Sequence, residues 1–73
     1  MSTLKAMYLD GDKLKRMRVL KGWSQRKLSA ESGVSQNTIV LMEKQGRVEG
    51  FRPATLHKLA TALGEDPAEL LQD

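Results

Sequence analysis

The sequence predicts a small all-α domain of five short helices, and three observations lead to this fold class. Short polar residues repeatedly precede, and glycines repeatedly follow, segments in which apolar residues recur every three or four positions. The clearest such stripe is Leu56, Leu59, Ala60 and Leu63. No segment shows the polar and apolar alternation of a strand. A chain of 73 residues suffices for one domain with one modest core.

The expected helix ends follow from the capping chemistry of individual residues. A short polar side chain accepts the free amide protons of a first turn, proline fits that turn, and glycine adopts the left-handed conformation that ends a helix. We expect an N-terminal arm over residues 1–9 and one domain over residues 10–73. In chain order, the expected elements are a helix through 13–21, opened by Asp10 or Asp12 and ended by Gly22; a helix over 25–32, opened by Ser24 and ended by Gly33; a helix from Gln36 to about Lys44, opened by Ser35; a loop over 45–52; a helix from Pro53 to Gly64; and a last short helix opened by Asp66, with Pro67 in its first turn.

The composition narrows the class of protein. The chain has no cysteine for disulfides or a zinc–thiolate site, and this suits a reducing compartment. It also has no apolar run long enough to cross a membrane. We therefore expect a cytoplasmic protein. His57 is the only histidine, and no cysteine or acid cluster accompanies it at a metal or triad spacing. We therefore expect no enzyme, no metal and no cofactor, and see no sign of a small-molecule ligand.

The charges are distributed unevenly along the chain. Residues 1–60 hold all 12 lysines and arginines and five acids, whereas residues 61–73 hold four acids and no base. A basic body with an acidic end suggests a surface that binds a polyanion, although a solvated mixed surface explains the charge equally well.

The second and third expected helices are joined by a short turn centred on Gly33, which is the spacing of a helix-turn-helix. Two segments then resemble the Cro/repressor (Xre-type) helix-turn-helix family: LKGWSQRKLSAESGVSQNTIVLMEKQG and PATLHKLATALGEDPAELL. The resemblance covers about residues 13–71 and implies a compact, five-helix, lambda-repressor-like fold that binds DNA. Two features depart from the family pattern: Ser29 replaces the usual alanine, and the loop between Glu43 and Pro53 is a few residues longer.

The third helix carries four consecutive apolar residues, which cannot all face one core at about 100° per residue. If Ile39 and Met42 point inward, the outer face presents two amides, two aliphatic groups and a cation. Amides pair with adenine edges and aliphatic groups contact thymine methyls in a major groove. The candidate base-reading residues, by this geometry and the family resemblance, are Gln36, Asn37, Thr38, Val40 and Leu41. The alternative is that Val40 and Leu41 are covered by the N-terminal arm or by a partner chain.

Phosphate contacts are expected at the helix N-termini and at cations near the third helix. The candidates are Ser24, Gln25, Arg26, Ser35, Lys44, Arg47 and Arg52. Among them, Gln25 matches a family position, so its contact with the DNA backbone is implied by the resemblance. The resemblance further implies a structural salt bridge between Arg18 and Glu43, which ties the first helix to the end of the third.

These features predict a sequence-specific regulator of transcription: a phage-type repressor, a restriction-modification controller or a similar autoregulator. Family members usually bind two-fold-symmetric operators as homodimers, so we expect a palindromic site. We expect Leu70 and Leu71, which are adjacent near the chain end, to need cover and to meet across the two-fold axis. The alternative function is a protein-interaction module, or an antitoxin-like partner, on the same fold.

Overall fold

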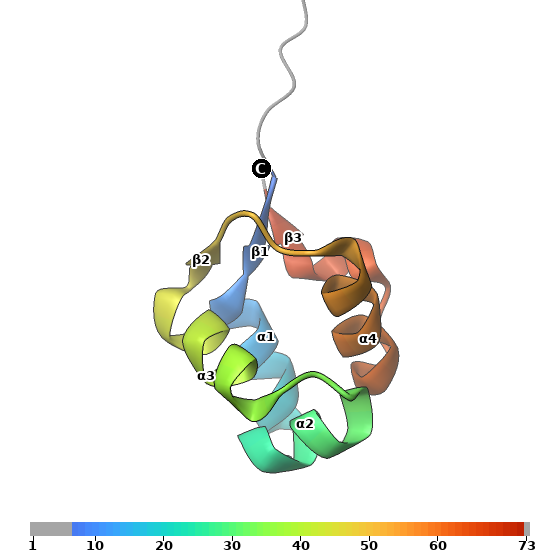
Figure 1. The fold of residues 1–73 in the computed structure, drawn as a ribbon. Coiled ribbons are helices and arrows are strands. Elements are labelled where there is room, and N and C mark those ends of the chain that lie inside the picture. Colours follow the sequence, from blue (N-terminus) through green and yellow to red (C-terminus); the bar gives the residue numbers. More distant parts are fainter. Residues whose placement is uncertain (1–6, 73) are drawn as a thin grey trace, which may run out of the picture.

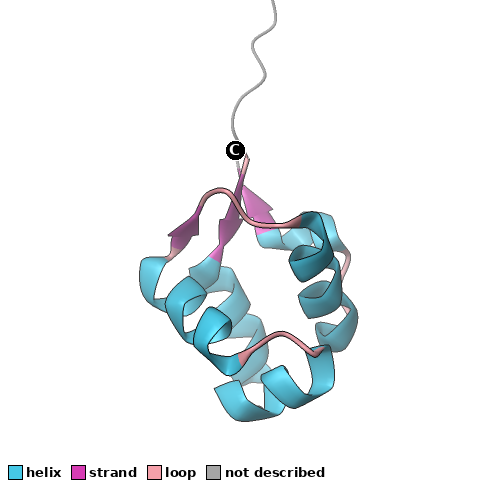
Figure 2. Cartoon of the chain, viewed as in Figure 1, coloured by secondary structure: helices cyan, strands magenta, loops and turns pink. Residues whose placement is uncertain are grey.

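The computed structural model describes residues 7–72, which form a mostly helical domain with a small sheet at one end (Figures 1 and 2). The elements, in chain order, are β1 (Tyr8–Asp10), α1 (Gly11–Leu20), α2 (Gln25–Ser32), α3 (Gln36–Gln45), β2 (Arg47–Val48), α4 (Pro53–Leu63), the 3-10 helix η1 (Pro67–Leu70) and β3 (Leu71–Gln72).

Three of the four α-helices begin at the polar residues predicted to cap them. Asp10 accepts a hydrogen bond from the Lys13 amide at 3.0 Å, and Ser24 accepts one from the Lys27 amide at 3.0 Å. Ser35 opens α3 in the same way. Pro53 begins α4, as expected, because its missing N–H would have no partner in a first turn.

The expected fold of five helices is wrong in its last element and in the absence of strands. Residues Pro67–Leu70 make a single 3-10 turn, after which Leu71 is extended and enters a strand. Two of the three strands have only two residues. Strands this short show no alternation of polar and apolar residues, so the sequence pattern does not indicate them.

The sheet joins three distant parts of the chain in the order β2-β1-β3, with both pairings antiparallel. Leu9 lies at its centre, opposite Val48 on one side and Leu71 on the other, and is fully buried. Tyr8 and Leu9, at the end of the expected N-terminal arm, thus belong to the sheet; residues 1–6 of that arm lie outside the described residues.

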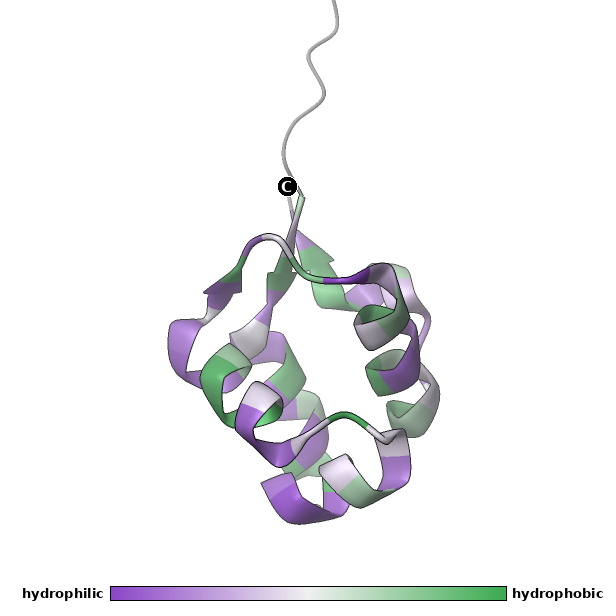
Figure 3. Ribbon diagram, in the orientation of Figure 1, coloured by the Kyte–Doolittle hydropathy of each residue, from purple (hydrophilic) through white to green (hydrophobic). Residues whose placement is uncertain are grey.

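The core is aliphatic and receives side chains from every helix and from the sheet. The stripe predicted on α4 is buried in full, and hydrophobic and hydrophilic residues are interspersed along this helix (Figure 3). The buried apolar residues are Leu9, Leu14, Leu28, Val34, Ile39, Met42, Val48, Leu56, Leu59, Ala60, Leu63 and Leu70.

The burial of Leu70 corrects one expectation about the chain end. Its side chain is fully buried within the same chain, and Leu71 is partly buried against the core. Leu70 therefore needs no partner chain to cover it, whereas Leu71 keeps part of its surface exposed.

Candidate nucleic-acid interface

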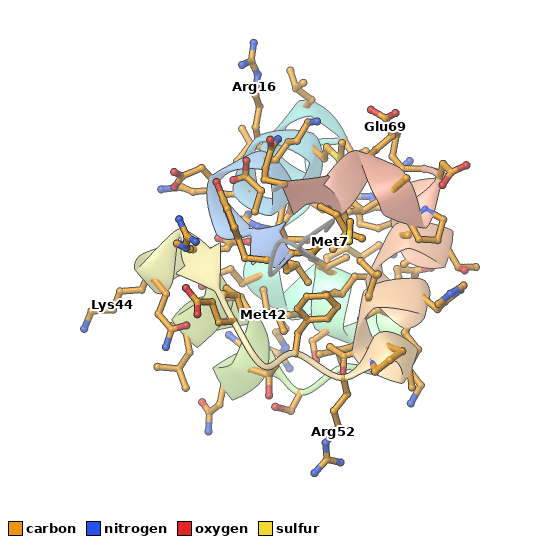
Figure 4. The ribbon with its side chains drawn as sticks, turned by 90° about the horizontal axis from the view of Figure 1, so that it is seen from above. Met7, Arg16, Met42, Lys44, Arg52 and Glu69 are labelled. Atoms are coloured by element: carbon orange, nitrogen blue, oxygen red, sulfur yellow. The ribbon has the colours of Figure 1, made fainter. Side chains whose placement is uncertain are left out.

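The helix α3 turns the predicted pair inward and the predicted face outward. Ile39 is fully buried and Met42 is 6% exposed, whereas Val40 and Leu41 are 36% and 55% exposed. Met42 lies inside the molecule and Lys44 projects from it (Figure 4). Tyr8 and Leu9, the described residues of the expected arm, lie in the sheet and leave Val40 and Leu41 exposed. The exposed outer face consists of Gln36, Asn37, Val40, Leu41 and Lys44.

The start of α3 is rigidly capped, and two candidate residues take part in the cap. The Ser35 hydroxyl accepts a hydrogen bond from the Thr38 amide at 3.1 Å and lies 2.9 Å from the Thr38 hydroxyl. Both hydroxyls thus have partners within the chain, and Thr38 is only partly exposed. Gln36 and Asn37 are exposed and have no hydrogen bond from their side chains to described residues.

The turn between α2 and α3 is held by the serine that departs from the family pattern. The Ser29 hydroxyl donates to the Val34 carbonyl at 2.7 Å. Gly33, in the left-handed conformation, ends α2, and its open surroundings show that backbone geometry, and not space, favours glycine there. The hydroxyl of Ser29 therefore adds a bond across the turn that alanine would lack.

A buried ion pair connects α1 to α3 at the positions that the resemblance implied. Arg18 Nε lies 2.7 Å from Glu43 Oε2, and Arg18 Nη2 lies 2.8 Å from Glu43 Oε1. The Arg18 side chain is 10% exposed and that of Glu43 is 3% exposed. The hydrogen bond with Glu43 raises the pKa of Arg18, opposing the effect of desolvation. Because the pair is bidentate and buried, it fixes α3 relative to α1.

Two further groups complete this network, and sequence reasoning assigned neither of them to it. Arg18 Nη1 donates to the Trp23 carbonyl at 2.7 Å, and Gln25 Nε2 donates to Glu43 Oε1 at 3.1 Å. The side chain of Gln25, expected at the DNA backbone, is thus directed at least partly toward α3. An amide nitrogen carries two protons, so one remains for another acceptor.

The close approach of α1 and α3 depends on a glycine that the sequence did not single out. The Gly11 amide donates to the Gly46 carbonyl at 2.6 Å. A Cβ on Gly11 would overlap the Met42 carbonyl oxygen and lie 2.9 Å from its carbon. No local pattern in the sequence marks this glycine, because the backbone that it approaches belongs to Met42 and Gly46.

The cations near α3 are not equivalent. Arg47 donates from Nε to Glu49 Oε2 at 2.8 Å, and its guanidinium lies 4.3 Å from the centroid of the Tyr8 ring. Lys44 and Arg52, by contrast, are exposed and project outward (Figure 4), and neither has a carboxylate partner within residues 7–72. Arg26, at the start of α2, is also exposed. Ser24 is exposed beside it, with its hydroxyl oxygen occupied by the cap.

Other kinds of site find little support in the described residues. Within residues 7–72, no three metal-ligating side chains gather closely enough to hold an ion. His57 lines a shallow, open hollow between α2 and α4 together with Glu31 and Lys58. None of the described helices has the length and apolarity needed to cross a membrane.

These features define a helix-turn-helix, formed by α2 and α3, whose second helix presents a polar and aliphatic face to solvent. The chain belongs to the family of Cro/C1-type helix-turn-helix DNA-binding domains, whose model matches residues 13–73. The family resemblance seen in the sequence is thereby confirmed, and the protein is a DNA-binding regulator.

Two solved structures resemble the fold over most of its length. The restriction-modification controller protein C.AhdI from Aeromonas hydrophila is 35% identical, with a TM-score of 0.73 over 82% of this chain and 88% of that chain. The hypothetical transcription factor NHTF from Neisseria is 26% identical, with a TM-score of 0.69 over 93% of this chain and 83% of that chain. No curated protein matches the sequence significantly.

Proposed function

We propose that the protein regulates transcription by reading a specific double-stranded DNA sequence in the major groove with the outer face of α3. The observation that carries this proposal is the exposure of Gln36, Asn37, Val40 and Leu41 on one side of a helix whose other side is buried. Gln36 and Asn37 would pair with adenine edges, and Val40 and Leu41 would contact thymine methyl groups. Thr38 has a smaller part, because its hydroxyl already bonds to Ser35.

Phosphate contacts on either side of this helix would set its register in the groove. Lys44 and Arg52 are exposed and free of carboxylate partners among residues 7–72, so they are the strongest candidates. Arg26 and the amides beside Ser24 and Ser35, at the starts of α2 and α3, would contact further phosphates. Gln25 would contribute its second amide proton, and Arg47 would bind phosphate only in competition with Glu49.

We further propose that the protein is a controller of the restriction-modification type that binds as a homodimer. The likeness to C.AhdI over most of both chains supports this assignment. One α3 reads only a few base pairs, and a two-fold pair of such helices matches a palindrome with half-sites about 10 base pairs apart. Because Leu70 is buried, the dimer surface must lie elsewhere than at that side chain.

Selection of bound sites from a random duplex library tests this function. We expect an enriched inverted repeat, a nonspecific affinity that falls with salt, and a sedimentation mass of two chains on the selected site. Recovery of unrelated sequences would contradict sequence-specific reading. A single half-site bound by one chain would contradict the homodimer but leave the reading helix in place.

The second candidate function is a protein-interaction module, and the exposure of Val40 and Leu41 is the observation that favours it. Such a module would bury the two aliphatic side chains against another protein. It would show no salt-dependent binding to random duplex DNA, whereas the proposed regulator would.

A further inference from the structure

The helix α1 has an exposed face that takes no part in the proposed binding of DNA. Lys15 and Val19 are four residues apart, as are Arg16 and Leu20, so these four residues lie together on one side of the helix. All four are exposed, whereas Leu14 on the opposite side is buried. We call the group Lys15, Arg16, Val19 and Leu20 the α1 outer face.

This face is turned away from the proposed DNA-binding surface. The inner side of α1 packs on α3, through Arg18 with Glu43 and through the close approach of Gly11 to Met42. In the view from above, Arg16 projects from the opposite edge of the molecule to Arg52 (Figure 4). A duplex held by α3 would therefore leave the α1 outer face accessible.

The aliphatic part of this face is unusually open. Val19 is 54% exposed and Leu20 is 77% exposed, which makes Leu20 the most exposed large apolar residue in the part of the chain that the structure describes. Single exposed leucines are common on protein surfaces. Two adjacent exposed aliphatic residues, Val19 and Leu20, beside cations are better explained by a surface that is covered in a complex.

The cations of this face lack partners of their own. No carboxylate of residues 7–72, including that of Asp12 one turn earlier, lies within ion-pair distance of Lys15 or Arg16. Lys21 follows directly and is also exposed, with its ammonium over the Trp23 ring. The face is thus positive and has no ion pair of its own, although Asp10 and Asp12 line a hollow beside Arg16. Its complement is an anionic group beside aliphatic side chains.

We propose that the α1 outer face is a docking surface for an acidic segment of a partner protein. Aliphatic side chains of the segment would cover Val19 and Leu20, and its Asp or Glu side chains would pair with Lys15 and Arg16. A second copy of this chain is a poor occupant, because a two-fold axis through the face would bring these cations close to their own counterparts. This surface is independent of the proposed reading of DNA by α3.

The test is a titration of the full ¹⁵N-labelled chain with a synthetic helical peptide that carries a leucine stripe flanked by glutamates. We expect amide shifts concentrated at residues 15–21. The affinity should fall roughly tenfold, about 1.4 kcal/mol, in Leu20→Ser and in Lys15→Glu/Arg16→Glu. Lys58→Glu, which removes an exposed cation on α4, is the matched control and should bind the peptide as the original chain does.

Several results would overturn the proposal. One is the absence of shifts at millimolar peptide; another is a set of shifts concentrated on α3, which would show the peptide acting as a substitute for DNA. Equal binding of a peptide with serine in place of leucine would exclude the apolar contact. Self-association that disappears in Leu20→Ser would make a second copy the occupant. The affinity of the same variants for duplex DNA, expected to stay within about twofold for Leu20→Ser, separates this surface from the reading helix.

Discussion

Arg18 and Glu43, 25 residues apart in sequence, form a bidentate ion pair that is buried between α1 and α3. The pair joins α1 to α3, the helix whose exposed face carries the candidate base-reading residues. Because the pair is buried and does not lie on the outer face of α3, we expect it to position α3 without contacting DNA.

Removal of one member of this pair should destabilise the protein strongly. Arg18→Met leaves the Glu43 carboxylate buried with only Gln25 as a partner, so we expect a loss of about 3 kcal/mol in the free energy of unfolding. Urea denaturation of both proteins measures it. Arg18→Met/Glu43→Leu should recover part of the loss, because no uncompensated charge remains; a double variant less stable than the single one would contradict this account. Since the pKa of Arg18 is raised, its charge contributes stability that is complete below the ordinary pKa of arginine and is lost as the pH rises through the raised value.

Gly11→Ala should be more harmful than alanine at an open glycine. The added methyl would overlap the Met42 carbonyl and force α1 and α3 apart, at about 2–3 kcal/mol in the free energy of unfolding. Gly50→Ala is the matched control: Gly50 has a φ of 70° but no neighbour within 4 Å, so only backbone strain of about 1–2 kcal/mol applies. Thermal denaturation compares the stability of the two variants. An equal loss of stability in both would show that the Met42 backbone moves aside at little cost.

Base reading and phosphate binding should respond differently to alanine. Gln36→Ala should cost about 1–3 kcal/mol on the preferred site and relax the preference at one base position. Lys44→Ala should weaken binding to all sequences alike and reduce the slope of log affinity against log salt by about one. Fluorescence anisotropy at several salt concentrations gives both quantities. If Gln36→Ala and Asn37→Ala both leave affinity and site preference unchanged, α3 does not read DNA and the protein-interaction function becomes the better one.

Glu49→Gln should strengthen the binding of random duplex DNA. The carboxylate of Glu49 accepts a hydrogen bond from Arg47 and adds a negative charge beside a candidate phosphate contact. Its neutralisation frees the Arg47 guanidinium, which still packs over the Tyr8 ring. We therefore expect the affinity for random duplex DNA to rise about threefold at low salt, and this gain to shrink as salt is added. Glu65→Gln, which removes an exposed acid after α4, is the control for net charge alone. An equal rise in both variants would show that Arg47 has no special part.

The sequence determined those parts of the protein that depend on local chemistry. Asp10, Ser24 and Ser35 fixed the starts of three helices, because a side-chain oxygen near a free amide acts within one turn. The helical period showed that four consecutive apolar residues cannot all be buried, and the choice of Ile39 and Met42 as the inward pair, with Val40 and Leu41 exposed, is confirmed. The family resemblance added the partnership of Arg18 with Glu43, which neither period nor charge identifies.

Only the tertiary structure decided what depends on residues far apart in the chain. Leu9 becomes the centre of a sheet because Val48 and Leu71 reach it from both sides, and strands of two residues have no signature of their own. The amide of Gln25 turns toward Glu43, although the family resemblance implied a phosphate contact for it. Gly11 matters because a carbonyl of another helix occupies the space of a side chain. In each case the partner is at least 18 residues away, and short-range patterns carry no information about contacts at that separation.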